Sequence, residues 1–415
     1  MASATGSELI QLISQVTDLG PQVVNDRSVV LRPPTFSDAA QWRRIRLRDR
    51  EFNEPYAPTS PLEWEAQHSV EEWVRRCLAL RKAQKVGRTV PFVIDVDGKF
   101  AGECALTWTE IGTSIAELSI WLDARAARGG VGKLAAAMLV DLAFDELQLA
   151  VVTAATGTDN VAASHGSETL GMRHEATMEE FFDAGGKRKQ YNFWTLLRAD
   201  KPTGGFAYRA ISSVRPAAPA DAVEAESAGG PSAFAVARYT AKFNCELALH
   251  GLLSRLQHSP KVARGPKAVA AGDVTLRNVR KSDASALRAA EIDVDPEVVL
   301  AIEVDGTLVG RTWLRLINAL SAEFGLSTDS SPPAVENAAA DLMVEYAFEV
   351  GCERIWVPVV VGDVRLRNLV KHLGMAHEGT LTQYREVSGV RKDHELWAFT
   401  RTRYSNRSAP DSHSR

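Results

Sequence analysis

The sequence predicts an α/β (α+β) fold of two tandem domains, each a mixed, mostly antiparallel sheet flanked by helices. Three observations support this prediction. The chain has 415 residues, more than one ordinary core holds, since domains usually contain about 150 residues. With 45% hydrophobic and 24% charged residues, its composition is that of a globular protein. The same succession of strand-like and helix-like segments also occurs twice along the chain.

The repeat begins with a short β-branched run that ends in a Ser-Asp helix start. VVLRPPTFSDA begins at Val29, and VTLRNVRKSDA begins at Val274. Two apolar runs around Asp-Gly follow in each copy and predict a hairpin, in FVIDVDGKFAGECALTW from Phe92 and LAIEVDGTLVGRTWLRL from Leu300. This shared order predicts an internal duplication.

A third pair of segments completes the repeat and shows a difference between the copies. LGMRHEATMEEFFDAGGKRKQYNFWTL begins at Leu170, and LGMAHEGTLTQYREVSGVRKDHELWAF begins at Leu373. The offset between copies is 245 residues at the first strand but 208 at the hairpin. The second copy therefore lacks 37 residues, which correspond to helical sequence around 52–88 of the first.

These segments and the composition between them define the expected domain organisation. The stretch 215–233 is rich in Ala, Pro, Gly and acidic residues, as mobile linkers are. Apolar residues at helical spacing then predict one amphipathic helix near 236–257, which packs on its own chain or binds a partner. The expected segments are an N-terminal extension (1–27), a first domain (28–200), a flexible linker (201–235), a linker helix segment (236–271), a degenerate second domain (272–404) and a disordered tail (405–415).

Charge, cysteine content and hydropathy exclude several classes of protein. The net charge of −4 provides no overall basic field for nucleic acid or anionic lipid. Cys77, Cys104, Cys245 and Cys352 form no CxxC pair, so we expect neither a metal site nor disulfides. No window approaches the ~18 apolar residues of a membrane span, and the N-terminus has no signal-peptide pattern. We therefore expect a cytoplasmic protein with no membrane contact.

A glycine-rich turn separates a strand-like run from a helical pattern in IAELSIWLDARAARGGVGKLAAAMLVDLAFDEL, which starts at Ile115. Glycines let backbone N–H groups approach a pyrophosphate, and a helix start adds unpaired N–H groups and the positive end of its dipole. The turn is neither a Walker loop nor GxGxxG, and a tight turn without a ligand is the alternative. The predicted phosphate cradle comprises Arg128, Gly129, Gly130, Val131, Gly132 and Lys133.

Further motifs coincide with this turn in order along the chain. LRPPTFSDAAQW, REFNEPYAPTSP, WLDARAARGGVG, DNVAASHGSETLGM and KRKQYNFWTL together resemble the GNAT acetyltransferases, most closely the branch that acetylates N-termini of ribosomal proteins. The resemblance covers Ser28 to Arg198, and more weakly Gly272 to Tyr404. It implies a splayed central strand pair in each domain and acetyl-CoA as the cosubstrate of the first.

The resemblance also assigns an acetyl-CoA site to the first domain. The sequence departs from the family at two positions, with Ala127 where the family has Gln or Arg and Ala163 where it has Ser. In the second copy, Pro332 and Pro333 occupy the turn and have no N–H to donate, so we expect no such cradle there. Beyond the cradle, the implied cofactor-binding residues are Leu118, Ile120, Trp121, Leu122 and Asn160.

Acetyl transfer to an amine needs an uncharged amine, a polarised thioester carbonyl and a proton for the leaving thiolate. Glu117 resembles the strand carboxylate that some family members use, through water, as general base. A surface strand residue is the alternative, and Glu323 stands at the same place in the second copy. Ser164 is the candidate proton donor, with a helix cap as the alternative. His165 is its neighbour and a second candidate donor, whereas His174 recurs in the second copy, which favours a structural role.

Acceptor specificity is expected from the insertion that only the first copy contains. Glu54, Tyr56 and Trp64 lie there, where the resembling family shapes its acceptor pocket, and core packing is the alternative for the two aromatics. A basic run on the following helix is either a solvated face or a site for an acidic peptide or the CoA 3′-phosphate. Its members are Arg75, Arg76, Arg81, Lys82 and Lys85.

The sequence therefore predicts an N-acetyltransferase whose first domain transfers acetyl from acetyl-CoA to a primary amine. The acceptor is a protein N-terminus or a small molecule, and an antibiotic-modifying enzyme would use the same fold. A catalytically weak CoA-binding or protein-interaction module is the alternative function. We interpret the second copy as a structural or specificity module, and we leave a homodimer open.

Overall fold

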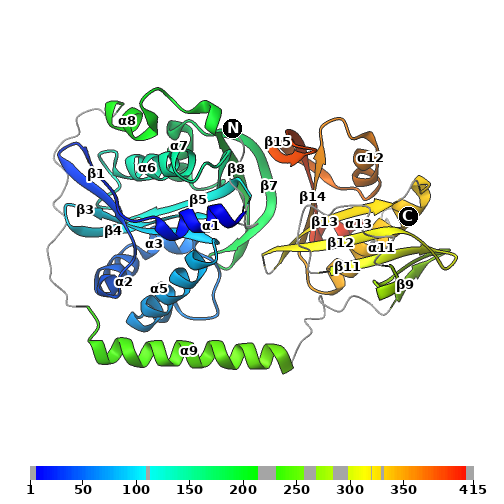
Figure 1. Cartoon of the computed structure of the whole chain (residues 1–415), viewed down its shortest axis with the longest axis horizontal. Helices are drawn as coiled ribbons and strands as arrows, with labels where there is room; N and C mark the ends of the chain where they lie inside the picture. The colour runs from blue at the N-terminus through cyan, green and yellow to red at the C-terminus, as the bar shows by residue number, and fades with distance from the viewer. Residues whose placement is uncertain are drawn as a thin grey trace, which may run out of the picture. The chain divides into compact units, whose positions relative to one another are not determined.

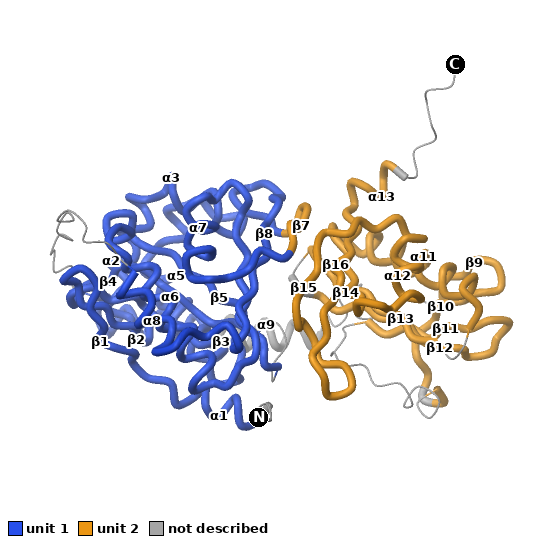
Figure 2. Tube along the Cα trace, turned by 90° about the horizontal axis from the view of Figure 1, so that it is seen from above, with its two compact units in different colours: residues 1–175, 182–249 blue, residues 176–181, 250–415 orange. Residues whose placement is uncertain are grey.

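The computed structural model describes residues 6–108, 113–213, 230–256, 268–283, 298–318, 320–328 and 331–407. The chain forms two compact units (Figure 2). Unit 1 comprises residues 1–175 and 182–249, and unit 2 comprises residues 176–181 and 250–415. Both are mixed α/β structures, as predicted. Among the described residues, no helix is long and apolar enough to cross a membrane.

Unit 1 is built on a mixed, mostly antiparallel sheet with the strand order β1-β2-β3-β4-β5-β6-β8-β7. The parallel pair β5 and β6 is joined only from Ile115–Val151 to Glu117–Thr153, although both strands continue beyond these residues. The predicted splayed central pair is therefore present. The strands are β1 (Leu19–Val24), β2 (Arg27–Arg32), β3 (Thr89–Val96), β4 (Lys99–Thr107), β5 (Ile115–Leu122), β6 (Val151–Gly157), β7 (Arg173–Ala184) and β8 (Lys187–Leu197).

Helices cover both faces of this sheet (Figure 1), with α6, α7 and α8 on one side and α2, α3 and α5 on the other. Alternation along β3 builds both cores, since Phe92 and Ile94 pack in the α6 core and Val93 packs in the α2/α5 core. The helices are α1 (Gly6–Gln15), α2 (Ala39–Arg48), α3 (Arg50–Asn53), α4 (Trp64–Gln67), α5 (Val70–Lys85), α6 (Val131–Asp145), α7 (Val161–Leu170), α8 (Gly205–Ser212) and α9 (Ala233–Leu256).

Unit 2 contains a sheet with the corresponding strand order, β9-β10-β11-β12-β13-β14-β16-β15. Its parallel pair, β13 and β14, is joined only from Ser321–Arg354 to Glu323–Trp356, so it splays after the same number of residues. The elements are β9 (Ala268–Ala271), β10 (Val274–Asn278), β11 (Val298–Val304), β12 (Thr307–Asn318), β13 (Ser321–Thr328), α11 (Pro333–Glu349), β14 (Arg354–Val360), α12 (Val364–His372), β15 (Ala376–Val387), β16 (Val390–Thr400) and α13 (Arg401–Arg407).

Both predicted Asp-Gly hairpins are confirmed. Asp97 and Gly98 join β3 to β4 with φ angles of 53° and 77°, and Asp305 and Gly306 join β11 to β12 with 50° and 76°. Two successive residues with positive φ are what a type I′ turn requires, and its twist matches that of the flanking strands.

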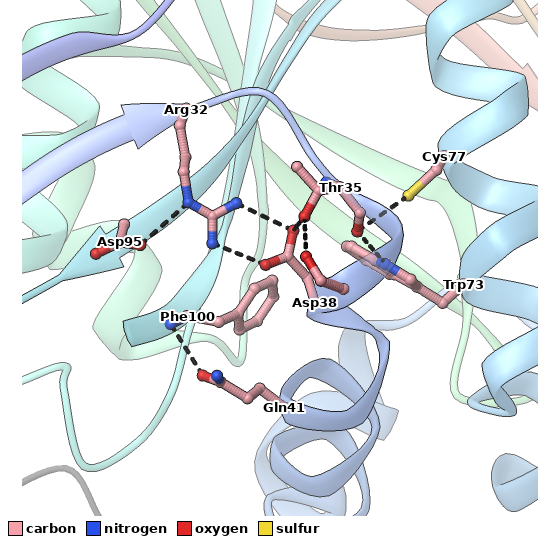
Figure 3. A network of polar contacts seen from close by, with 9 residues as sticks. Arg32, Thr35, Asp38, Gln41, Trp73, Cys77, Asp95 and Phe100 are labelled. Atoms are coloured by element: carbon pink, nitrogen blue, oxygen red, sulfur yellow. Dashed lines mark hydrogen bonds and ion pairs between the residues drawn. The ribbon is translucent and has the colours of Figure 1, made fainter. Parts of the chain in front are cut away.

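A polar network fixes the junction between β2 and α2 in unit 1 (Figure 3). Arg32 bonds Asp38 through both terminal nitrogens, at 2.7 and 3.0 Å, and its Nε lies 3.1 Å from Asp95 Oδ2. Thr35 O accepts the Trp73 indole N–H at 2.8 Å, which ties α5 to the same junction. Burial raises the pKa of the nearby Cys77 thiol to about 12, so this thiol stays protonated.

The same ion triad occurs in unit 2. Arg277 bonds Asp283 at 2.6 Å and Glu303 at 2.5 Å, and these three residues match Arg32, Asp38 and Asp95 in the sequence repeat. The two units thus share strand order, splay and this network.

The ends of the first domain differ from our expectation. Part of the predicted N-terminal extension folds into unit 1, because Leu9 and Ile13 of α1 are buried in the α6 core. The predicted linker begins later than residue 201, since α8 packs through Phe206, which is 1% exposed. Only tertiary contacts show this, because α8 has too few residues for a clear helical pattern.

The region between the domains contains the predicted helix and one strand that we did not predict. α9 lies where we expected a helix near 236–257, and its Lys242 Nζ lies 2.6 Å from Glu71 Oε1 of α5. Residues 268–271, assigned to the linker helix segment, form β9 instead and pair with β10. Most of the predicted linker (214–229), residues 257–267 and tail residues 408–415 lie outside the described residues.

Candidate active site

The segment after β5 is held in place by two carboxylates. Asp123, which is 1% exposed, accepts hydrogen bonds from the N–H groups of residues 125–127 at 2.8–2.9 Å through its side-chain and carbonyl oxygens. Asp49 accepts from Ala124 N at 3.0 Å, and Arg48 bonds both carboxylates. The N–H groups of residues 124–127 are therefore already used.

The next residues, 128–133, which we name the N–H cradle, differ from residues 124–127 because, in the part of the chain that the structure describes, their backbone N–H groups are not used. Within the described ranges, their N–H groups have no acceptor. Gly129 and Gly130 have φ angles of 80° and 87°, and Gly130 is the N-cap of α6. The first-turn N–H groups of a helix lack intrahelical partners, and the dipole makes this end positive. This is the geometry that binds phosphate groups, and its donors start at the predicted Arg128.

Two segments outside the predicted first domain also contact the cradle. Asn25 Nδ2 donates to Gly129 O at 3.2 Å, and Lys133 Nζ donates to Ser213 Oγ at 2.9 Å. Burial, and then the charge of Arg209 in α8, lowers the pKa of Lys133. No sequence motif marked these residues, because the contacts join segments 80 or more positions apart.

Glu117 is the last residue of β5 that pairs with β6, so its side chain lies where the splay begins. The side chain is half-buried, and across the described ranges the carboxylate has no hydrogen-bond or ion-pair partner. Burial raises the pKa of Glu117 above its ordinary value. A carboxylate with this environment accepts protons more readily than an ordinary glutamate.

Tyr191 of β8 links Glu117 electrostatically to a group of aromatic and charged side chains. Burial raises the pKa of Tyr191 to about 12, with further contributions from Asp159, Tyr56 and Glu117. Tyr56 OH donates to Asp159 O at 3.2 Å, and Lys189 Nζ lies 4.8 Å from the Tyr56 ring centroid. The predicted substrate residue Tyr56 and Glu117 thus both act on Tyr191. Tyr191 was missed because strand alternation alone does not show which face of the sheet a side chain of β8 occupies.

Ser164 lies in a short chain of hydroxyl groups. Trp194 Nε1 donates to Thr156 Oγ1 at 2.8 Å, and Thr156 Oγ1 lies 3.2 Å from Ser164 Oγ. Since Thr156 can donate its own proton to Ser164, the Ser164 proton is available to another group. The cap of α7 is Asn160, whose Oδ1 accepts from Ala163 N at 3.1 Å. Asn160 therefore caps α7, its predicted role in cofactor binding stays a prediction, and Ser164 is not the cap.

The other predicted site residues have varied surroundings. Trp64 is 2% exposed and donates its indole N–H to Arg46 O at 3.0 Å, which fits core packing better than acceptor contact. Glu54 forms an exposed ion pair with Arg50 at 2.7 Å. Along β5, Leu118 is buried in the α6 core and Ile120 is 39% exposed.

The structure also places His165 and His174, two histidines singled out in the sequence. The His165 side chain is 74% exposed and 4.0 Å from Glu168, and His174 Nε2 lies 3.2 Å from Asn192 Oδ1. In the part of the chain that the structure describes, no group of three or more His, Cys, Asp or Glu is placed to hold a metal ion.

A third histidine, His68, is buried and hydrogen-bonded at both ring nitrogens. His68 is 3% exposed, its Nδ1 lies 2.6 Å from Trp64 O and its Nε2 accepts from Arg46 Nε at 3.0 Å. This pattern fits the neutral ring. Burial, and then the charges of Arg46, Arg43 and Arg76, lowers the pKa of His68 to about 4.

We therefore expect unit 1 to lose stability as the pH falls from about 6.5 to about 4. In this window the unfolded chain binds a proton at His68 and the folded chain does not, so protonation favours unfolding. The shift corresponds to about 3 kcal/mol. Urea unfolding of His68→Gln should show a weaker pH dependence than the native chain, whereas His165→Gln should match the native chain. An unchanged slope in His68→Gln would contradict this account.

The residue that matches Glu117 in unit 2 has the opposite environment. Glu323 is likewise the last residue of β13 that pairs with β14, but it is fully buried between two arginines. Arg385 contacts both of its oxygens, at 2.5 and 2.7 Å, and Arg315 bonds one of them. Burial alone would raise the pKa of Glu323, but the charges of Arg385 and Arg315 lower it. This carboxylate is therefore a fixed anion and a poor base.

The helix start of α11 is also different from that of α6. Pro332 is the N-cap and Pro333 follows it, so donors are lost as the sequence predicts. Glu336 lies in the first turn, is 4% exposed and bonds Arg365 of α12 at 2.8 Å and Thr328 at 2.5 Å. A carboxylate of the chain itself thus lies in the first turn of α11.

Comparison with known proteins identifies the class of unit 1. Residues 28–173 match the model of the acetyltransferase (GNAT) domain family. This stretch is a GNAT acetyltransferase domain, so the predicted family is confirmed for the first domain and the chain carries an acetyltransferase domain. No curated protein matches the chain.

The chain is also similar to several solved structures. RimJ of Mycobacterium smegmatis, in complex with CoA-disulfide, is 28% identical with a TM-score of 0.46, over 48% of this chain and 96% of that one. The ribosomal-protein-S5-alanine acetyltransferase of Vibrio fischeri is 21% identical with a TM-score of 0.38, over 42% and 96%. RimL, a ribosomal L7/L12 α-N-protein acetyltransferase in complex with coenzyme A, is 15% identical with a TM-score of 0.37, over 44% and 99%.

Proposed function

We propose that unit 1 transfers an acetyl group from acetyl-CoA to a primary amine, with a protein N-terminus as the acceptor. The observation that carries this proposal is the pairing of an unused N–H cradle with the unpartnered Glu117 at the splay of one GNAT domain. Cys77, Cys104 and Cys352 are free and buried, which suits the reducing cytoplasm that we propose as the location.

The residues of unit 1 have the following proposed roles. The N–H groups of residues 128–133 hold the pyrophosphate of acetyl-CoA, whose thioester supplies the acetyl group. Glu117, directly or through one water, removes a proton from the attacking amine as the C–N bond forms. Ser164 gives a proton to the sulfur as the C–S bond breaks, and it recovers one through Thr156 or solvent. One proton leaves the amine and one reaches the thiolate, so the transfer is balanced.

We propose that unit 2 arose by duplication of unit 1 and has no acetyltransferase activity. Strand order, splay and the Arg277 triad support the duplication. Two carboxylates support the lack of activity. Glu323 is held in ion pairs with Arg315 and Arg385, and Glu336 places a negative charge in the first turn of α11.

Replacing Glu323 with Gln should therefore leave acetyl transfer unchanged but destabilise unit 2. The amide would leave two arginines without their carboxylate, and breaking such a buried pair costs about 3–5 kcal/mol. Thermal unfolding and a free-thiol assay on the same sample check both expectations. Loss of activity in a folded Glu323→Gln protein would contradict the proposed division of roles.

The proposed function itself is tested by acetyl-CoA titration followed by an amine panel, monitored through free thiol. The panel contains N-terminal peptides and small-molecule amines. The proposal predicts binding and acceptor-dependent thiol release above hydrolysis. Binding without acceptor-dependent release across the panel would favour the alternative, a CoA-binding interaction module.

A further inference from the structure

We infer that unit 1 selects acceptors that carry a carboxylate a few residues from the reacting amine, and that Arg46 of α2 and Arg76 of α5 bind this carboxylate. The inference rests on the proposed acetyl transfer and adds the substrate class. It starts from a small group of side chains at the outer end of β4 and β5, on the α2/α5 side of the sheet.

Glu103 of β4 is the acid shared by this group. It is 7% exposed, and both of its oxygens are in use: Oε1 accepts from Arg76 Nε at 2.9 Å and Oε2 accepts from Trp121 Nε1 at 2.8 Å. Glu103 is also the acid whose charge acts on both Arg46 and Arg76. One carboxylate therefore serves two guanidinium groups.

Among the residues that the structure describes, Arg46 has no charged hydrogen-bond partner. Its Nε donates to neutral His68 and its Nη1 donates to Asn53 Oδ1, both at 3.0 Å, and its Cζ lies 4.7 Å from the Trp121 ring centroid. Burial, and then the like charge of Arg76, lowers the pKa of Arg46 to about 10. This environment holds a cation at a cost that an additional anion would reduce.

Both arginines keep hydrogen-bond donors for such an anion. Across the described ranges, Arg46 Nη2 and both terminal nitrogens of Arg76 have no acceptor. The Arg76 side chain is 48% exposed, so a ligand can reach it from solvent. A carboxylate matches these donors because guanidinium groups bind its two oxygens through paired hydrogen bonds.

The arginine pair lies on the face that carries the candidate base. Glu117 pairs with Thr107 across β4 and β5, and Trp121 pairs with Glu103, so alternation places Glu117, Ser119 and Trp121 on one face. Four strand residues span roughly 13 Å, the length of three to four residues of an extended peptide. An amine at Glu117 would therefore place an acidic side chain from the second to fourth acceptor residue near the pair.

The remainder of the basic run on α5 does not share this geometry. Arg75 lies 3.4 Å from Glu72 in the same helix, and the Arg81 guanidinium lies 4.4 Å from the Phe36 ring centroid. Within the basic run on α5, Arg76 is therefore directed to the β4/β5 face, whereas Arg75 contacts Glu72 and Arg81 contacts Phe36. Arg75 provides a matched control, because it is adjacent in sequence and equal in charge.

The test compares peptides that differ at one position, with Asp or Asn as residue 3, as acceptors for the full-length chain. We expect the native protein to favour the Asp peptide by roughly tenfold or more in kcat/KM. Arg76→Gln should reduce this preference to less than about threefold and leave the KM for acetyl-CoA unchanged, Arg76→Lys should retain part of it, and Arg75→Gln should behave as the native chain does.

Three outcomes would overturn the inference. The first is equal use of both peptides by the native protein. The second is an Arg76→Gln variant that weakens acetyl-CoA rather than the Asp peptide, which would assign the pair to a CoA phosphate. The third is equal affinity, measured by calorimetry, for the N-acetylated Asp and Asn product peptides. This binding measurement decides the inference even if no peptide is acetylated, a result that would contradict the proposed function separately.

Discussion

Replacing Glu117 with Gln is expected to lower kcat by about 10²–10⁴-fold, the usual contribution of a positioned general base. Gln has the same shape but cannot accept the proton of the amine. The fold should be unaffected, because Glu117 has no ion pair to lose within the described residues. Steady-state thiol release and calorimetric acetyl-CoA titration measure the two effects, and we expect the acetyl-CoA affinity to be unchanged.

The pH dependence of activity provides a second test of Glu117. Glu117 must be ionised to act, and its pKa is raised by burial above the ordinary value of 4.5. As the pH decreases, protonation of Glu117 should therefore lower the activity of the native chain, and this loss should begin at a higher pH than for an ordinary glutamate. In Glu117→Gln this loss should disappear. The loss caused by protonation of the acceptor amine, with a pKa near 8, should persist. A variant with native kcat would exclude Glu117 as the base.

Replacing Gly132 with Asp is expected to weaken acetyl-CoA binding by about 100-fold or more. The carboxylate would stand in the first turn of α6, where it repels a pyrophosphate and competes for the same N–H groups. The fold should tolerate it, because an acidic side chain near a helix start is stabilising and a Cβ at Gly132 meets its nearest neighbour, Leu122 Cδ2, at 3.9 Å.

Gly132→Ala is the matched control for Gly132→Asp. It adds the same Cβ without the charge, so its acetyl-CoA affinity should stay within a few-fold of native. Calorimetry on both variants separates charge from bulk. Equal affinities for Gly132→Asp and the native chain would place the phosphate site elsewhere, whereas equal losses in both variants would indicate steric crowding alone.

Much of the fold could be predicted from the sequence because its signals are local. The Asp-Gly turns, the alternating strands and the glycine-rich turn before α6 each occupy a few consecutive residues. The boundaries of the first domain could not be predicted equally well. α1 and α8 join unit 1 through Ile13 and Phe206, and such packing depends on segments distant in the chain.

The candidate site was predictable in part for the same reason. The N–H cradle and Glu117 follow from one continuous segment, but the environment of Glu117 does not. Glu117 and Glu323 occupy matching positions in similar strands, yet one has no partner within the described residues and the other lies between Arg315 and Arg385. The sequence contains all four residues, but only the folded chain shows which carboxylate is free to accept a proton.

The central claim is that one unit of this chain binds acetyl-CoA and uses it. Calorimetric titration of the full-length protein with acetyl-CoA tests this claim most directly. We predict one binding site per chain, lost in Gly132→Asp and retained in Glu323→Gln. Two sites per chain, or one site that survives in Gly132→Asp, would contradict the assignment of the cofactor to the N–H cradle of unit 1.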